Sequence, residues 1–332
     1  MTPRWFRSND QLLLLPLVLL AGCRPKDTTA SAFRWPAPSR FQVQESVRKT
    51  DGENDSSAVI LHTFEFIPTN NAYWLRWLNV EYQSVNGQPV TSDEDKRNLE
   101  PTKRFYLETP PMLINRKGEF LGTVDLNLRK ELDRVDNLMD QMNPGRAQSR
   151  TNAGAPRYSD VLDSPAGKKM YDQALSTYWT TWVEPWLGWD VRPGQVSSNS
   201  MSIPLEGRIE LPGILIRENL VSATNAPGRV HLRYQQFIEG KEFAAFMSGL
   251  FSMTNSGIKA DEGPLATNSG GRLVIIEVMT DPHSLMPLWA KRKMILSLDV
   301  PGKGRVSQKE VREYQFLSWQ TNGLQATALK TE

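Results

Sequence analysis

The residue types of an acyl-transfer triad occur together in one short run of the sequence: Asp281, Pro282, His283 and Ser284. A triad depends on side chains that converge from separate parts of a fold, and neighbours in one turn rarely point at one another. We therefore expect this run to be a turn that ends a strand. The other two histidines, His62 and His231, lie in strand-like stretches, where a packed or solvent-facing histidine is more common than a catalytic one.

Motifs that would identify an enzyme do not occur in this chain. The sequence contains no HExxH metal motif, no Walker loop, no GxSxG elbow and no dinucleotide-binding GxGxxG. We therefore predict no catalytic residue, metal ion or cofactor and favour a non-catalytic protein. A pair of carboxylates for glycoside hydrolysis leaves no sequence spacing, so that alternative stays open.

Charge also narrows the possible partners of the chain. The 39 basic and 37 acidic residues give a formal net charge of +2. A dedicated nucleic-acid surface would need a marked basic excess, so we expect no nucleic-acid partner.

An aromatic stripe is the most unusual feature of the body. Its spacings of three and four place these rings on one helical face: Tyr178, Trp179, Trp182 and Trp186. Large rings bring apolar area to a core, and core packing is the more common use of such a stripe. The alternatives are a hydrophobic ligand groove, sugar stacking and a patch at a membrane interface.

A second apolar face occurs on the helix expected between residues 242 and 251. Phe243, Phe246 and Met247 follow a helical spacing on it. Core packing is again the simpler interpretation. The functional alternative is a lid over a ligand cavity, because Met and Phe adapt to irregular apolar shapes.

The first 23 residues follow the layout of an export signal. Arg4 and Arg7 precede an apolar run from Leu12 to Leu20, which is too short to span a bilayer. The run ends in Leu20-Ala21-Gly22-Cys23, and Cys23 is the only cysteine of the chain.

This ending resembles the lipobox of bacterial lipoproteins. The resemblance implies cleavage before Cys23, attachment of lipid to its thiol and a place in the cell envelope. In Gram-negative members of this family, Asp directly after the lipidated cysteine keeps the protein in the inner membrane. Arg24 stands at that position here, so the resemblance implies the periplasmic side of the outer membrane if the host is Gram-negative. The implied partner is the membrane itself, through lipid on Cys23.

Period-two patterns dominate the body, with strands expected at Phe41–Val47, 59–67 and 73–85 and then repeatedly from residue 195 to 319. We also expect an extended run at 104–115, a helix at 128–142 and a second helix at 166–182. The predicted organisation is a signal peptide at 1–22, a flexible stalk at 23–40, a β-rich half ending in a helix at 41–142, a linker at 143–160, and a helix followed by a second β-rich half at 161–332.

These elements predict an α+β fold that is predominantly antiparallel β, a curved sheet or half-barrel packed on two or three amphipathic helices. One large core or two modest ones are both open, as is a similarity between the halves. The element order resembles uncharacterised periplasmic lipoproteins and the curved-sheet carriers of lipids and lipoproteins. The first functional hypothesis is an envelope lipoprotein that binds or carries an apolar ligand, either a lipid or a lipidated peptide. Alternatives are a structural or assembly lipoprotein that binds another envelope protein, and a carbohydrate-binding or carbohydrate-active protein.

Overall fold

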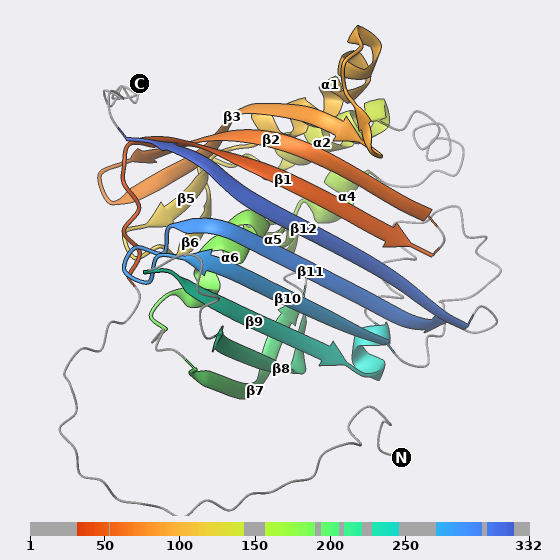
Figure 1. Ribbon diagram of the computed structural model, residues 1–332. Coiled ribbons are helices and arrows are strands. Elements are labelled where there is room, and N and C mark those ends of the chain that lie inside the picture. The colour runs from red at the N-terminus through yellow and green to blue at the C-terminus, as the bar shows by residue number, and fades with distance from the viewer. Residues whose placement is uncertain are drawn as a thin grey trace, which may run out of the picture.

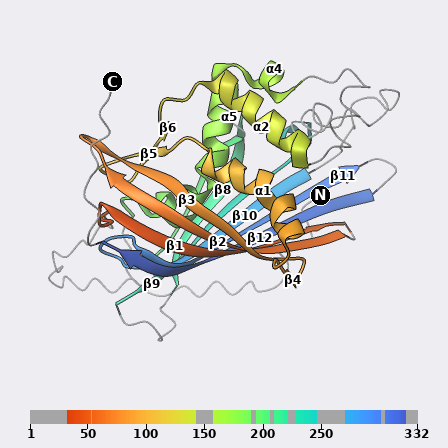
Figure 2. The same ribbon diagram turned by 90° about the horizontal axis from the view of Figure 1, so that it is seen from above.

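One curved antiparallel sheet of twelve strands organises the protein, and helices lie on its concave face (Figures 1 and 2). The computed structural model describes residues 32–52, 54–142, 157–189, 194–205, 209–220, 228–245, 270–300 and 304–321. The sheet does not close into a barrel, and all its strand pairs are antiparallel. The predicted α+β class with a curved antiparallel sheet is therefore confirmed.

The strand order places the two halves of the chain side by side in the sheet. The order is β6-β5-β3-β2-β1-β12-β11-β10-β9-β8-β7, and β4 pairs with β3. The strands of the first half are β1 Ser39–Asp51, β2 Asn54–Pro68, β3 Ala72–Val85, β4 Gln88–Pro89, β5 Met112–Asn115 and β6 Phe120–Thr123. Those of the second half are β7 Val196–Leu205, β8 Ile209–Leu220, β9 Val230–Glu239, β10 Gly270–Thr280, β11 Pro287–Val300 and β12 Gly304–Gln320.

The first and last strands meet in the centre of the sheet. β1 pairs with β12 from Arg40 opposite Gln320 to Asp51 opposite Gln308. Every other neighbouring pair joins strands of the same half. The β1–β12 ladder thus makes one sheet out of two half-sheets.

Alternation along the strands directs one set of side chains to the helices. On β1 the inward set includes Phe41, Val43 and Glu45, which are 1%, 0% and 0% exposed. The period-two pattern predicted for this strand is confirmed. It also brings the carboxylate of Glu45 to the apolar side of the sheet.

Ordered packing begins earlier than the sequence indicated. Order was expected to begin near Phe41, after a stalk ending at residue 40, but Phe33 and Trp35 are buried in the main core. The Trp35 Nε1 group donates a hydrogen bond to the Leu285 carbonyl at 2.9 Å. Large rings in a Pro-rich and Ser-rich stretch were the missed signal, because burying them offsets the loss of chain entropy.

The helices differ most from the expectation. The described part of the chain contains five α-helices rather than two or three: α1 Asp93–Leu107, α2 Leu128–Met142, α4 Tyr158–Leu162, α5 Pro165–Leu175 and α6 Thr177–Trp182, followed by the 3-10 turn η1 Glu184–Trp186. The predicted helix at 128–142 is confirmed, whereas the one expected at 166–182 is divided at Ser176. The extended run expected at 104–115 is wrong in its first part, because α1 continues to Leu107.

Hydrophobic periodicity does not reveal helix α1, because the helix is polar on nearly all sides and none of its residues is buried. Its start is nevertheless encoded locally. The Ser92 side chain accepts a hydrogen bond from the Asp95 backbone N–H at 3.0 Å and donates to the Asp95 carboxylate at 2.6 Å. Three acidic residues in the first turn also suit the positive end of the helix dipole.

Several predictions lie outside the described residues. They include the signal peptide and Cys23, most of the linker at 143–160, and Phe246 and Met247. Residues 241–245 are helical, in agreement with the first residues of the helix expected there. None of the described helices is both long enough and apolar enough to cross a membrane.

Candidate functional site

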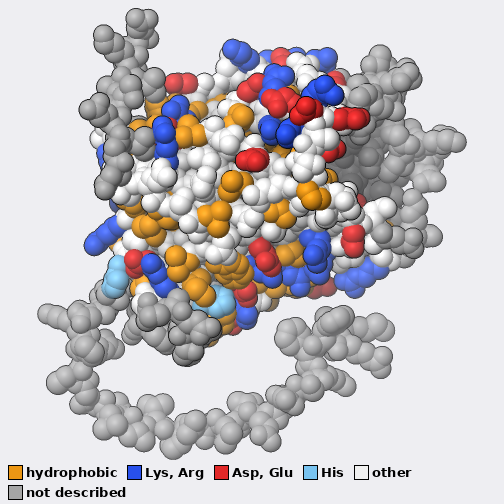
Figure 3. All heavy atoms as spheres, turned by 45° about the horizontal axis from the view of Figure 1, so that its top comes forward, with side chains coloured by type: hydrophobic (Ala, Val, Ile, Leu, Met, Phe, Trp, Pro, Cys, Tyr) orange, Lys and Arg blue, Asp and Glu red, His pale blue; other side chains and the backbone are white. Residues whose placement is uncertain are grey.

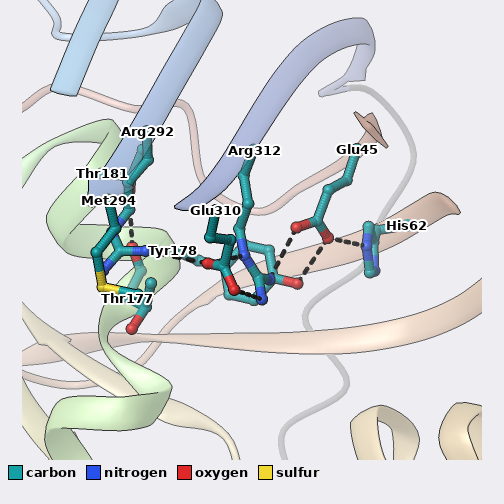
Figure 4. Close-up of polar contacts among 9 residues, drawn as sticks. All are labelled: Glu45, His62, Thr177, Tyr178, Thr181, Arg292, Met294, Glu310 and Arg312. Carbon is teal, nitrogen blue, oxygen red and sulfur yellow. Dashed lines mark hydrogen bonds and ion pairs between the residues drawn. The ribbon is translucent and has the colours of Figure 1, made fainter. Parts of the chain in front are cut away.

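A buried carboxylate, Glu45 of β1, joins four elements beneath the helices (Figure 4). Its Oε2 atom lies 2.8 Å from Nε2 of His62 on β2 and accepts a hydrogen bond of 2.8 Å from the hydroxyl of Tyr178 on α6. Its Oε1 atom accepts a hydrogen bond of 3.0 Å from Nη1 of Arg312 on β12. Glu45 therefore connects the two half-sheets to each other and to a helix.

The network continues along the concave face toward solvent. Arg312 donates through Nε to Glu310 at 2.8 Å, and Arg292 on β11 donates to the same carboxylate at 3.2 Å. The side chains of Arg312, Glu310 and Arg292 are 25%, 16% and 17% exposed, whereas Glu45 and His62 are fully buried. We call these five residues the charge network. The network extends from the fully buried interior to a margin that is partly exposed to solvent.

Strand register explains why these residues meet. Glu45 lies opposite Tyr314 of β12 and Ile60 of β2, so its inward side chain reaches the next inward positions of both neighbours, Arg312 and His62. Inward positions on neighbouring strands lie within reach of long side chains.

Electrostatics in this network follow from burial and pairing. Burial alone would raise the pKa of Glu45, but the contacts with His62, Arg312 and Tyr178 hold the pKa below its ordinary value. Burial likewise opposes ionisation of Glu310, yet its hydrogen bond from Arg312 lowers the pKa of the carboxyl. Burial, together with the charge of Glu45, raises the pKa of Tyr178 far above its ordinary value. Glu45 thus stays ionised near neutral pH while Tyr178 remains a hydrogen-bond donor.

A histidine, a carboxylate and a tyrosine in contact could in principle transfer protons. Their surroundings make such a role unsuitable, because Glu45 and His62 are fully buried and Tyr178 is 6% exposed under aromatic rings. A substrate atom has no approach to them. The arrangement instead fixes the β1–β12 junction and α6, which is a structural role.

The aromatic stripe lies beside the charge network. Tyr178 is 6% exposed, and Trp179, Trp182 and Trp186 are fully buried. The Trp182 ring lies 5.4 Å from the ring of Phe64 and 5.1 Å from that of Phe316. The structure therefore brings together four of the residues predicted to line a ligand site, and rings of both half-sheets occupy the space around Trp182.

Phe243, another predicted lining residue, lies elsewhere. It is 1% exposed in a second apolar cluster, whose other members are Ile203, Leu211, Ile238, Leu296 and Leu298. This cluster is separate from the one that holds the α6 tryptophans. The structure does not bring Phe243 together with the stripe.

The triad-like run forms the predicted turn between β10 and β11. The Asp281 carboxylate accepts a hydrogen bond of 2.9 Å from the His283 backbone N–H, and Arg229 lies 3.4 Å from it. The His283 side chain is exposed. No group of three or more His, Cys, Asp or Glu side chains with the geometry of a metal site occurs among the described residues.

A groove between α1 and β3 has a volume of about 250 Å³. Its walls include Val80, Tyr82 and Leu99, and the flexible Lys96 and Lys103. This volume is below the range of about 300–1,000 Å³ that is usual for small-molecule sites. We assign no ligand to it.

The convex face of the second half-sheet carries an apolar band. Cross-strand register aligns Ile214, Phe237, Leu273 and Ile295 of β8, β9, β10 and β11 in one row. Ile214 is 44% exposed and Phe237 is 39% exposed, and the other two are half-buried. Strands β9 to β12 lie in front of α6 in Figure 1, so this row faces away from the helices.

Paired charges bound this band on one side. Two rows further along the same strands, Arg233 contacts Glu277 at 2.7 Å and Glu218 at 3.5 Å, and Lys291 contacts Glu313 at 2.5 Å. An apolar row rimmed by polar groups is typical of a surface that binds another molecule.

The sequence signals for these sites differ in strength. Glu45 shares the inward phase of Phe41 and Val43, and this was visible in the sequence. An acid in an apolar phase indicates a buried polar contact, but its partners depend on which strands are neighbours.

Comparison with known proteins adds no family: no protein-family model matches this chain, and no curated protein matches it either.

Proposed function

We propose that this chain is an exported envelope lipoprotein, anchored by lipid on Cys23, whose body is a non-catalytic scaffold that binds another envelope protein through its convex face. The observation that supports binding is the row of Ile214, Phe237, Leu273 and Ile295. A soluble domain rarely exposes neighbouring large apolar side chains without a partner. The support for anchoring is the lipobox sequence.

Site-specific photo-crosslinking in the native cells tests the binding. A photoreactive phenylalanine at position 237 should give one discrete cross-linked species of higher mass. The matched control carries the same residue at Val306, which is 41% exposed at the far end of β12. Equal cross-linking at both positions, or none at 237, would contradict a specific partner on the convex face.

An apolar cargo between sheet and helices is the second candidate. Its support is the second apolar cluster around Phe243, which the sheet builds apart from the main core. Native mass spectrometry of the protein purified from its own envelope, with lipid extraction, measures any cargo. A bound lipid that disappears with Phe243→Ala but stays with Trp182→Phe would favour this second function over the first.

The carbohydrate hypothesis gains nothing from the stripe. Trp179, Trp182 and Trp186 are fully buried, and a buried ring cannot stack on a sugar.

A further inference from the structure

The point at which the N-terminal segment joins the body is fixed by contacts. The Phe33 ring packs 5.4 Å from that of Trp179, and the Arg34 backbone N–H donates a hydrogen bond of 3.1 Å to the Ser284 carbonyl. Ser284 belongs to the turn between β10 and β11. In Figure 1 this turn lies at the left-hand end of the strands. We call this end of the body, with Arg34, the β2–β3 turn, the β5–β6 turn and the β10–β11 turn, the stalk end.

Chain length then limits how far the stalk end can lie from Cys23. Eight residues lie between Cys23 and Ala32, the first described residue, so nine Cα–Cα steps join the two. A chain of this length spans at most about 32 Å even when fully extended. The 17-residue strand β12 covers about 56 Å, so the opposite end of the sheet is considerably farther from the anchor.

Cations without acidic partners gather at the stalk end. Within the described part of the chain, Arg34, Arg116 and Lys117 form no ion pair, and all three are outside the core. Arg116 donates to the Thr69 carbonyl at 2.6 Å, and its guanidinium lies 4.5 Å from the centre of the Tyr73 ring. These contacts hold the cation in place without neutralising it.

Two further arginines at this end share one acidic partner. Arg40 and Arg76 both contact the single carboxylate of Glu65, at 3.0 and 2.6 Å. Figure 3 shows more Lys and Arg than Asp and Glu side chains at the left-hand end of the visible face. The charges that dominate the upper right of the same view, over α1, have both signs. Acids also occur at the stalk end: Glu119 is exposed in the β5–β6 turn, and Asp281 pairs with Arg229. Cations still outnumber acids there.

Exposed apolar side chains accompany these cations. Leu121 of β6 is 55% exposed and Leu317 of β12 is 51% exposed. Trp74, Trp289 and Trp319 are half-buried near the same ends of their strands. Tryptophan, leucine and arginine together are the side chains that favour the boundary between headgroups and acyl chains.

We propose that the stalk end docks on the bilayer that carries the anchor and binds its anionic headgroups through Arg34, Arg116 and Lys117. The inference rests on the proposed anchoring through Cys23. Docking turns the far ends of β11 and β12 away from the membrane and leaves the convex band accessible from the side. Each basic side chain near an anionic surface contributes about a fivefold gain in binding.

Depth-dependent quenching tests the orientation with the full mature chain. The protein is reconstituted into vesicles of phosphatidylcholine, with or without phosphatidylglycerol, and a single introduced cysteine carries an environment-sensitive fluorophore. Leu121→Cys reports the stalk end, and Val306→Cys is the control, since its residue is 41% exposed at the opposite end of β12. Spin-labelled lipids should quench the probe at 121 and spare the probe at 306.

Charge reversal tests the headgroup contact. Lys117→Glu removes one positive charge and adds a negative one, so it should weaken docking on anionic vesicles, measured by quenching at position 121, by at least about fivefold. A salt concentration of about 0.5 M should weaken it too, because it shortens the electrostatic range to a few ångströms. Lys309→Glu, a reversal of an exposed cation near the far end of β12, should have no effect. Equal quenching at positions 121 and 306 would overturn the docking. Quenching at 121 that is the same with and without phosphatidylglycerol would overturn it as well.

A separate measurement distinguishes failure of the anchor from failure of the docking. The mass of the N-terminal peptide shows whether Cys23 carries lipid. If it does not, the proposed anchoring fails, and docking is then measured by adding the same unlipidated protein to anionic vesicles. Lack of binding there overturns the docking independently.

Discussion

Removing the charge of Glu45 while keeping its shape should greatly destabilise the protein. Glu45→Gln leaves one acceptor and one donor where the native side chain offers only acceptors. If the amide NH₂ group turns toward Arg312, two donors meet; if it turns toward Tyr178 and His62, Arg312 faces an uncharged amide oxygen in place of the carboxylate, and the Tyr178 hydroxyl no longer has a carboxylate oxygen to donate to. Breaking a buried charge pair from one side costs about 3–5 kcal/mol, so we expect the free energy of unfolding to fall by that amount.

A matched control lies on the opposite face of the same sheet. Glu65 is 6% exposed and also joins two arginines, but these are 46% and 40% exposed and stay hydrated when the acid is removed. Glu65→Gln should therefore cost about 1 kcal/mol or less. Urea unfolding followed by tryptophan fluorescence at pH 7 measures both free energies.

The pH dependence of the difference in unfolding free energy between the native protein and Glu45→Gln provides a second test. Contacts hold the pKa of Glu45 in the folded state below its ordinary value of 4.5. Its stabilisation is then fully present above pH 4.5 and is lost as the pH falls through the lower, folded pKa. The gap between the native protein and Glu45→Gln should narrow in that acidic window. A Glu45→Gln protein as stable as Glu65→Gln at pH 7, or a gap that widens with acid, would refute this reasoning.

Three further substitutions probe the same core, each read by the midpoint and free energy of urea unfolding. Tyr178→Phe removes the hydroxyl that donates to Glu45 at 2.8 Å and should cost about 1.5–3 kcal/mol; a neutral result would mean that this hydrogen bond adds nothing. Trp182→Ala should cost about 3–5 kcal/mol because it leaves a cavity among fully buried rings, and a loss below about 1 kcal/mol would contradict close packing there. Gly118→Ala should lower the free energy of unfolding more than Gly52→Ala does. Both glycines have positive φ, but only at position 118 would the new methyl group lie 2.7 Å from a neighbouring ring. Equal losses of stability would show that backbone strain alone determines the cost.

Much of the sheet could be predicted because its strands carry a period of two with one wet face. β1 shows why this worked: Phe41 and Val43 alternate with polar residues, and burial follows that alternation. Helix α1 could not be found in this way, since its contacts involve few apolar residues. Its cap at Ser92 was a local signal that periodicity analysis does not use.

The charge network could be predicted only in part. The inward phase of Glu45 was visible, but Arg312 lies 267 residues away in the chain. Their contact depends on β1 having β12 as its neighbour, and no local pattern specifies that choice. The spacing of the aromatic stripe predicts one helical face, but this holds only for its first part, because α6 ends at Trp182 and Trp186 lies on the 3-10 turn η1. The surroundings of the stripe depend on rings that both half-sheets supply, and no local pattern specifies them.

The central position of β1 and β12 has a consequence for the order in which the sheet folds. Because β12 follows every other strand of the sheet in the sequence, the central ladder cannot form until all of those strands have been synthesised. Pairing over such a sequence separation is entropically costly and slow. Such a delay suits the proposed export: the half-sheet of β1, β2 and β3 alone lacks Arg312, the cation of β12 that pairs with Glu45, so early closure of this half-sheet is disfavoured.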